Sequence, residues 1–149
     1  MVTGPTARVA GPADRAEVLA LRTRVFVDEQ GVPAELERDD RDATAVHVLS
    51  RAGGPAGPVV ATGRLLLPGD GGTTAVIGRM AADASVRGRG HGAAVLAELH
   101  RQAALRGMTA VELHAQLTAR GFYERAGYRA VGPEYLEAGI AHVTMRREL

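Results

Sequence analysis

The 149-residue sequence contains no cysteine, lysine, asparagine or tryptophan. The absence of cysteine excludes disulfide bonds, metal sites built on thiolates and a cysteine nucleophile. The absence of lysine excludes a nucleotide-binding P-loop, because that motif needs a lysine before its serine or threonine. Only two phenylalanines and three tyrosines are present, which is too few for a surface that stacks on nucleic-acid bases.

A strong charge of one sign is lacking as well. All 18 basic residues are arginine, 17 carboxylates balance them, and the net charge is +1. Because arginine, alanine and glycine all have GC-rich codons, the arginine count does not by itself indicate a nucleic-acid partner. No apolar run could span a bilayer, and the first ten residues do not resemble a signal peptide. We therefore expect a cytoplasmic protein that binds neither nucleic acid nor membrane.

Length and a hydrophobic content of 46% predict one globular domain over residues 1–149. Periodicity and turn residues predict the order β-α-(α)-β-β-β-α-β-α-β-β. Strands are expected at 7–10, 45–51, 59–68, 73–82 and 109–115, with two more in 128–149, and helices at 13–31, 90–106 and 118–127. This order is typical of an α/β (α+β) fold with a mixed sheet and helices on both faces. The acidic segment 35–42 is interpreted as a solvated loop rather than a surface that attracts amines.

A glycine-rich segment, VRGRGHG at 86–92, lies between a predicted strand and a predicted helix. Its glycines, at 88, 90 and 92, are evenly spaced and do not fit the dinucleotide-binding pattern. Successive glycine N–H groups and a helix start can converge on an anion, and a diphosphate would suit such a cradle. The local pattern favours a plain turn and an anion cradle about equally.

Four motifs in register resemble the GCN5-related N-acetyltransferase (GNAT) family. Residues 79–92, RMAADASVRGRGHG, are similar to its acetyl-CoA signature, and residues 116–128, QLTARGFYERAGY, are similar to a second family segment. LRTRVFVDEQGVP and YLEAGIAHVTM resemble the ElaA-like branch. The family's usual asparagine and final phenylalanine are replaced by Gln116 and Tyr128. The resemblance implies a mostly antiparallel sheet of six to seven strands that is splayed at the fourth and fifth strands.

The same resemblance implies an N-acetyltransferase that moves an acetyl group from acetyl-CoA to a primary amine by direct attack in a ternary complex. The alternative is a non-catalytic acyl-CoA-binding or regulatory module. The acceptor would be a small-molecule amine or a peptide N-terminus or lysine, and the protein a monomer or homodimer. No metal is expected, because His91 and His100 are nine residues apart and no cysteine assists them.

The resemblance also assigns candidate site residues. Tyr123 is the candidate general acid, since a phenol is protonated at neutral pH, and Phe122 is expected to be the more inward-facing of the two neighbours. His142 and Glu29 are candidate bases, Glu29 also being a candidate substrate contact, while Glu112, His114 and Glu137 remain alternatives. An N–H near Ala81 or Ala82 is expected to stabilise the oxyanion. The predicted residues that bind acetyl-CoA are Met80, Ala81, Ala82, Arg87, Gly88, Arg89, Gly90, His91, Gly92, Gln116 and Phe122.

Overall fold

A computed structural model describes residues 4–149, so residues 1–3 of the predicted domain lie outside the described part. The strands are β1 (Ala7–Val9), β2 (Val46–Arg51), β3 (Val59–Leu66), β4 (Thr74–Ala82), β5 (Ala110–Gln116), β6 (Arg129–Ala130), β7 (Tyr135–Glu137) and β8 (Ile140–Glu148). The α-helices are α1 (Arg15–Arg22), α2 (Ala34–Glu37), α3 (His91–Leu105) and α4 (Arg120–Arg125). Shorter helical turns are η1 (Pro12–Asp14), η2 (Thr23–Glu29), η3 (Asp40–Ala43), η4 (Ala84–Val86) and η5 (Leu117–Ala119).

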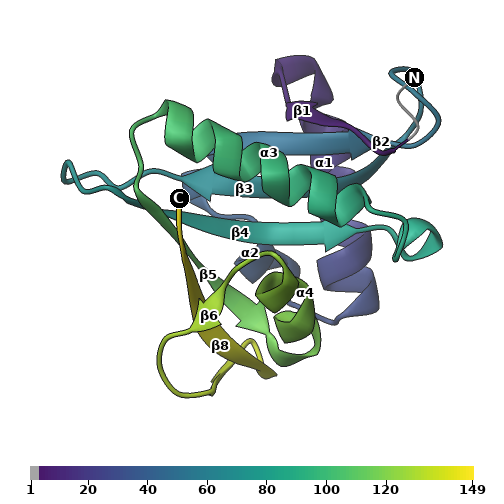
Figure 1. Cartoon of the computed structure of the whole chain (residues 1–149). Helices are drawn as coiled ribbons and strands as arrows, with labels where there is room; N and C mark the ends of the chain where they lie inside the picture. The colour runs from purple at the N-terminus through teal and green to yellow at the C-terminus, as the bar shows by residue number, and fades with distance from the viewer. Residues whose placement is uncertain (1–3) are drawn as a thin grey trace.

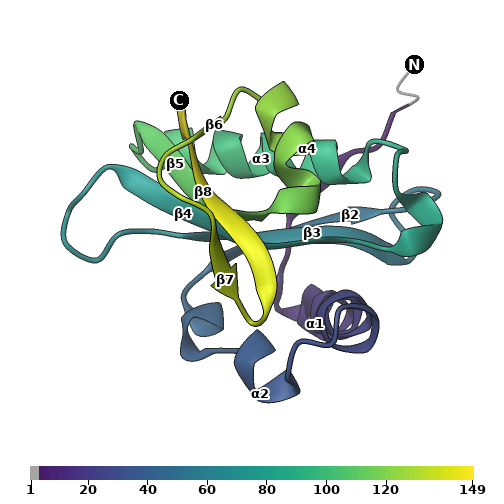
Figure 2. The same cartoon turned by 90° about the horizontal axis from the view of Figure 1, so that it is seen from below.

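The strands form one sheet in the order β1-β2-β3-β4-β5-β8-β6, and β7 pairs with β8 at its far end. All pairs are antiparallel except β4 with β5. Helices α3 and α4 cover one face of the sheet, and α1 and α2 cover the other (Figure 2). The predicted mixed, mostly antiparallel sheet with helices on both faces is confirmed (Figure 1).

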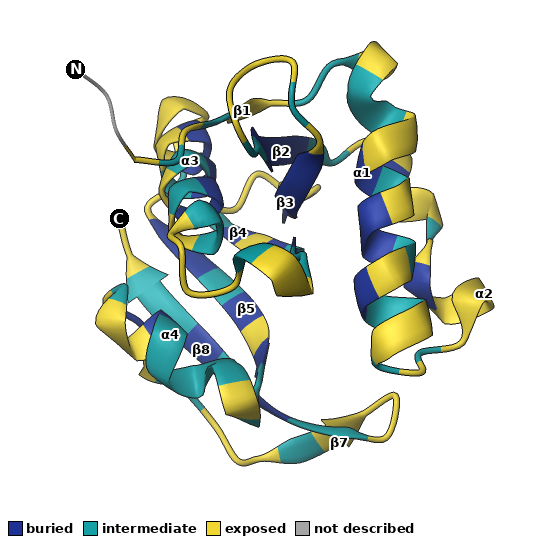
Figure 3. Ribbon diagram, turned by 90° about the vertical axis from the view of Figure 1, so that its right-hand side faces the viewer, coloured by how far each residue is buried: buried dark blue, intermediate teal, exposed yellow. Residues whose placement is uncertain are grey.

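Each face of the sheet has its own hydrophobic core. Under α3, Val95, Leu96 and Leu99 pack on strand residues such as Leu65 and Ile77. A smaller core under α1 is built from Val18, Leu21, Val25, Leu49, Val59 and Ala81. Figure 3 shows the buried stripes of α1 and α3 turned toward the sheet between them. Burial of these two stripes fixes the helices on opposite sides of the sheet.

Two details differ from the sequence prediction. The sheet has eight strands rather than six or seven, because the short β6 and β7 both pair with β8. The helix expected at 13–31 changes type along its length, from η1 through α1 to the π-helical η2. Such π-helical turns are rare and often occur at functional sites.

Candidate active site

The sheet opens between β4 and β5. Their parallel pairing begins at Thr74 opposite Ala110 and ends at Ile77 opposite Leu113. Beyond that point β4 stays paired with β3 as far as Ala82, and β5 stays paired with β8 as far as Gln116. The two strands therefore diverge, as Figure 1 shows, and the predicted splay of the fourth and fifth strands is confirmed.

A cavity of about 730 Å³ lies at this opening. Its walls come from η2, α2, β4, β5, α4 and the β7–β8 hairpin. Among the residues predicted for the site, the lining includes Glu29, Met80, Ala81, Ala82, Arg87, Gln116, Tyr123 and His142. The fold thus brings together segments that are more than 110 residues apart in the chain, from Glu29 to His142.

A β-bulge shapes the β4 side of the cavity. Gly78 pairs with Arg64 and Ala81 pairs with Thr62, so Arg79 and Met80 together face one residue of β3. Arg79 adopts the left-handed conformation, with φ 53°, which is uncommon for a non-glycine residue. Strained backbone of this kind concentrates at functional sites, and here it bends β4 where it leaves β5.

The backbone of β4 offers an N–H group to the opening. The N–H of Asp83 donates to the carbonyl of Val60 on β3 at 2.8 Å. Because successive peptide groups of a strand point to opposite sides, the N–H and C=O of Ala82 face away from β3 and toward the opening. The Arg87 guanidinium donates to that Ala82 carbonyl at 3.1 Å, consistent with this orientation. Of the two predicted oxyanion donors, Ala82 therefore fits better than Ala81.

The glycine-rich loop leads from β4 into α3. Gly88 and Gly90 have φ values of 82° and 93°, which only glycine adopts without strain, and Gly90 is the N-cap of α3. A helix start leaves its first N–H groups without intrahelical acceptors. The backbone itself therefore favours glycine at 88 and 90, as both a plain strand-to-helix turn and an anion cradle would require.

The three polar side chains of the loop, those of Arg87, Arg89 and His91, differ in their contacts. Arg87 forms a bidentate ion pair with Glu29 at 2.6 and 2.8 Å, and this contact lowers the pKa of Glu29. Arg89 is exposed, and the His91 imidazole is turned toward Ser50, 2.8 Å from its hydroxyl. The lowered pKa weakens Glu29 as a base, so the structure argues against that candidate role.

On the opposite wall, Gln116 ends β5 and donates a hydrogen bond of 2.8 Å to the side chain of Gln30. This contact joins the C-terminal end of η2, which Gln30 caps, to β5. Phe122 lies beside the loop, since a Cβ atom placed on Gly92 would meet its ring at 3.7 Å. Gln116 lines the cavity, whereas Phe122 lies outside its lining, as do the predicted loop residues 88–92.

Tyr123 reaches the cavity from α4. It is only 7% exposed, and its ring packs edge-on against Phe122 and Tyr128. Burial raises the pKa of Tyr123, so the phenol keeps its proton throughout the physiological range. The expectation that Phe122 would be the more inward-facing neighbour was wrong, because Phe122 is only partly buried and Tyr123 belongs to the core.

His142 lies on the far side of the cavity, on β8. It is 6% exposed, whereas its neighbour Val143 packs into the core below α3. Glu137 lies 3.7 Å from His142 Nε2 and 3.4 Å from His114 Nδ1. Glu112, another candidate base, forms an ion pair with Arg146 at 2.9 Å, away from the cavity lining.

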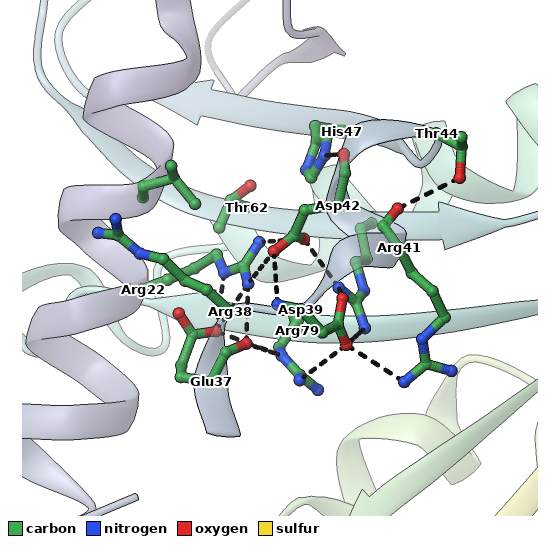
Figure 4. Close-up of polar contacts among 12 residues, drawn as sticks. Arg22, Glu37, Arg38, Asp39, Arg41, Asp42, Thr44, His47, Thr62 and Arg79 are labelled. Carbon is green, nitrogen blue, oxygen red and sulfur yellow. Dashed lines mark hydrogen bonds and ion pairs between the residues drawn. The ribbon is translucent and has the colours of Figure 1, made fainter. Parts of the chain in front are cut away.

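One wall of the cavity belongs to an ionic cluster, since Glu37, Arg64 and Arg79 are part of the lining. The cluster also contains Arg22, Asp39 and Asp42 (Figure 4). Arg22 and Arg64 are 1% and 2% exposed and both donate to Asp42 at 2.7 to 2.8 Å. Burial alone would raise the pKa of Asp42, but the hydrogen bonds from these arginines outweigh it and lower that pKa to about 2.

This cluster corrects the interpretation of segment 35–42 as a solvated loop. Glu37 is 2% exposed and Asp42 is 9% exposed, and both are neutralised by arginine. A signal was present in the sequence, because Arg64 lies inside the apolar stretch VVATGRLLL and a buried arginine needs a carboxylate partner. The segment anchors α2 and η3 to the sheet.

Residues 4–149 contain neither a candidate metal centre nor a candidate membrane-spanning helix. No group of three or more histidine, aspartate or glutamate side chains in this range is arranged to hold a metal ion. No helix in the same range is both long and apolar enough to cross a membrane.

Comparison with known proteins supplies the family. Residues 14–149 match the acetyltransferase (GNAT) domain. YyaT of Bacillus subtilis is 33% identical over 146 residues, which cover 95% of this chain and 94% of that protein. The N-acetyltransferase YjcF of the same organism is 33% identical over 129 residues, 86% of this chain and 88% of that protein.

Solved structures agree with this match. An acyl-CoA N-acyltransferase from Pseudomonas aeruginosa superposes with a TM-score of 0.81 at 33% identity, over 97% of this chain and 99% of that one. Escherichia coli ElaA superposes with a TM-score of 0.83 at 26% identity, with the same coverage. The chain therefore belongs to the GNAT family of acetyltransferases, and it is similar to ElaA as its terminal motifs predict.

Proposed function

We propose that this protein transfers an acetyl group from acetyl-CoA to a primary amine, by direct attack of the amine within a ternary complex. The observation that carries the proposal is the opening between β4 and β5, whose cavity is lined by Arg87 of the glycine-rich segment and by Tyr123 and His142. A donor and an acceptor can enter such an opening together. Family membership supports the acyl transfer itself.

The residues present suit a coenzyme A donor. The strand edge of β4 beyond Ile77 has no strand partner on the β5 side and suits the amide-bearing arm of such a molecule. The N-terminus of α3 at Gly90 suits its diphosphate. Arg87 would add charge, although Glu29 holds its guanidinium in this structure. When bound, the donor supplies a thioester whose acetyl carbon is open to attack.

The chain's own groups meet two needs of the reaction. The N–H of Ala82 would stabilise charge on the carbonyl oxygen, since a fixed donor in a site shielded from water is effective there. Tyr123 would give its proton to the departing sulfur, because its hydroxyl is protonated and its residue lines the cavity. The walls of the cavity would hold the two reactants next to each other and make the step effectively intramolecular.

A non-catalytic module that only binds acyl-CoA is the alternative. Such a module needs the strand edge and the loop but has no use for a proton donor in the cavity. The position of Tyr123, buried and part of the cavity lining, favours the enzyme.

The proposal is tested in two steps. Acetyl-CoA at about one hundred times its Kd should raise the Tm by roughly 5 to 10 °C, because it binds only the folded state. A panel of primary amines that includes polyamines, amino sugars, amino acids and peptides is then assayed for release of free thiol from acetyl-CoA. A Tm indifferent to millimolar acetyl-CoA would rule out the proposal. A Tm shift without thiol release from any amine would favour the binding module.

A further inference from the structure

One face of the sheet carries a set of polar groups that the proposed donor site does not use. The β7–β8 hairpin pairs Tyr135 directly with His142. Glu137 is two residues from Tyr135 and so shares its face, next to His142 on the diagonal. His114 on β5 lies on the same face. Gln116 of β5 pairs directly with His142 of β8, and His114 is two residues before Gln116, so its side chain points to the same side of the sheet. All except Tyr135 line the cavity.

The turn of this hairpin fixes its register. Ala138 and Gly139 both have positive φ values, 51° and 76°, as in a two-residue type I′ turn. Glu137 and Ile140 close the turn as a cross-strand pair. Because a two-residue turn leaves no slack, Glu137 is held beside His142 by the backbone itself.

The protonation site of His142 is set by the backbone. Its Nδ1 lies 2.6 Å from the carbonyl oxygen of Ile140. A carbonyl can only accept, so Nδ1 must carry a hydrogen and donate it. In the neutral imidazole the lone pair is then on Nε2, the nitrogen that lies 3.7 Å from Glu137. This arrangement suits a general base, because Nε2 has a lone pair that can accept a proton while the hydrogen bond from Nδ1 fixes the ring.

Other groups around His142 hold the ring in place. The Tyr135 ring stacks on it, with centroids 5.9 Å apart and planes 26° apart. The titratable groups that face it are Tyr135 and Glu137 of β7 and His114 of β5, and Gln116, its cross-strand neighbour, carries no charge. The gap of 3.7 Å between Nε2 and the Glu137 carboxylate is longer than a hydrogen bond, which leaves both groups free to contact a third.

From this geometry we propose that Glu137 and His142 form the site where the acceptor is deprotonated: the Glu137 carboxylate binds a cationic ammonium, and His142 Nε2 is the general base. This proposal rests on the proposed function, and it specifies that the acceptor amine binds in its protonated, ammonium form. His114 is a positioning residue, since it contacts Glu137 on the side away from His142.

Two protons leave the acceptor nitrogen by separate routes. Nε2 of His142 accepts one proton from the ammonium, and Glu137 stabilises the imidazolium. The freed amine forms a C–N bond with the acetyl carbon while the C–S bond breaks, and the sulfur takes its proton from Tyr123. The nitrogen loses its second proton, which returns through water to Tyr123, and His142 releases its proton to solvent. Each turnover yields one amide, one thiol and one proton.

The test measures kcat/KM for an amine from pH 6 to pH 10. His142→Gln is expected to lower kcat/KM by roughly 100-fold or more near pH 7, a typical contribution of a general base. The deficit should shrink steadily toward pH 10, where the amine has lost its proton in solution. Glu137→Gln should mainly raise KM for the amine, with a smaller change in kcat. A deficit of His142→Gln that is equal at every pH, or no deficit, overturns the proposal.

Controls separate this proposal from the proposed function. His100→Gln removes a histidine outside the cavity lining and should leave the pH profile as in the wild type. Each variant should keep the Tm shift with acetyl-CoA, so that a lost donor site is recognised. Nitrogen NMR of the wild type needs no acceptor: Nδ1 of His142 should carry the hydrogen in the neutral ring, and a hydrogen on Nε2 instead would contradict the assignment of the base.

Discussion

At the scale of single residues, the contacts of a side chain determine whether it can move a proton in the cavity. Tyr123 and Tyr128 are both buried tyrosines of the same core, yet only Tyr123 lines the cavity, while the Tyr128 hydroxyl lies 2.6 Å from His100 Nε2. Glu29 is tied to Arg87, whereas His142 has a free nitrogen. Similar side chains thus differ in role because their partners differ.

The two tyrosines give a matched pair of variants. Tyr123→Phe should lower kcat by roughly 100-fold or more while the Tm shift with acetyl-CoA persists, because the variant loses a proton donor and keeps the ring. Tyr128→Phe removes a hydroxyl of equal size from the same core and should change Tm more than kcat. Steady-state thiol release and thermal melts measure both. Equal turnover of Tyr123→Phe and the wild type would reduce Tyr123 to a packing residue.

At the scale of elements, the strand–loop–helix unit from β4 to α3 follows closely from the sequence. Positive φ values at Gly88 and Gly90 explain why glycine stands there. The donor site that we propose on that loop rests on the resemblance to the family. The β4 bulge at Arg79 was not predictable, because nothing in the local sequence marks a non-glycine residue with φ 53°. Its bend depends on contacts with a segment some 40 residues earlier, where the Arg79 side chain donates to the Glu37 carbonyl at 2.9 Å.

Two glycines at opposite ends of α3 test the loop. Gly90 and Gly107 have φ values of 93° and 81°, so valine is strained at either position. Gly90→Val should abolish the Tm shift with acetyl-CoA, because relief of that strain turns the first N–H groups of α3 away from one another. Gly107→Val should lose similar stability and keep the shift. The comparison is made by thermal melts with and without acetyl-CoA, and a normal shift in Gly90→Val would remove the loop from the donor site.

At the scale of the whole molecule, the ionic cluster could be predicted only in part, because Arg64 in an apolar stretch indicates a buried carboxylate partner but not which one. Arg22, Arg64 and Arg79 come from three separate elements and meet carboxylates of a segment that looks solvated by composition. The pattern of charges in a short stretch of sequence can indicate ion pairs only between residues that are close in the chain, whereas these partners are 15 to 42 residues apart. The tertiary fold decides whether an acidic segment faces water or arginine.

This cluster should make the fold sensitive to acid. The pKa of Asp42 is about 2 in the folded protein and near 3.8 ordinarily, so the folded state binds its proton less readily than the unfolded chain. The stabilisation, about 2 kcal/mol, is therefore complete above roughly pH 5 and is lost as the pH falls from about 4 to 2. Urea unfolding of the wild type between pH 2 and 6 should show that the free energy of unfolding falls as the pH decreases through this window.

Asp42→Asn should be less stable than the wild type at pH 6, because Arg22 and Arg64 lose a shared partner, and its free energy of unfolding should fall less steeply with decreasing pH. Asp40→Asn, an exposed neighbour outside the cluster, should follow the wild-type curve; if Asp42→Asn follows it too, the cluster does not set the acid limit.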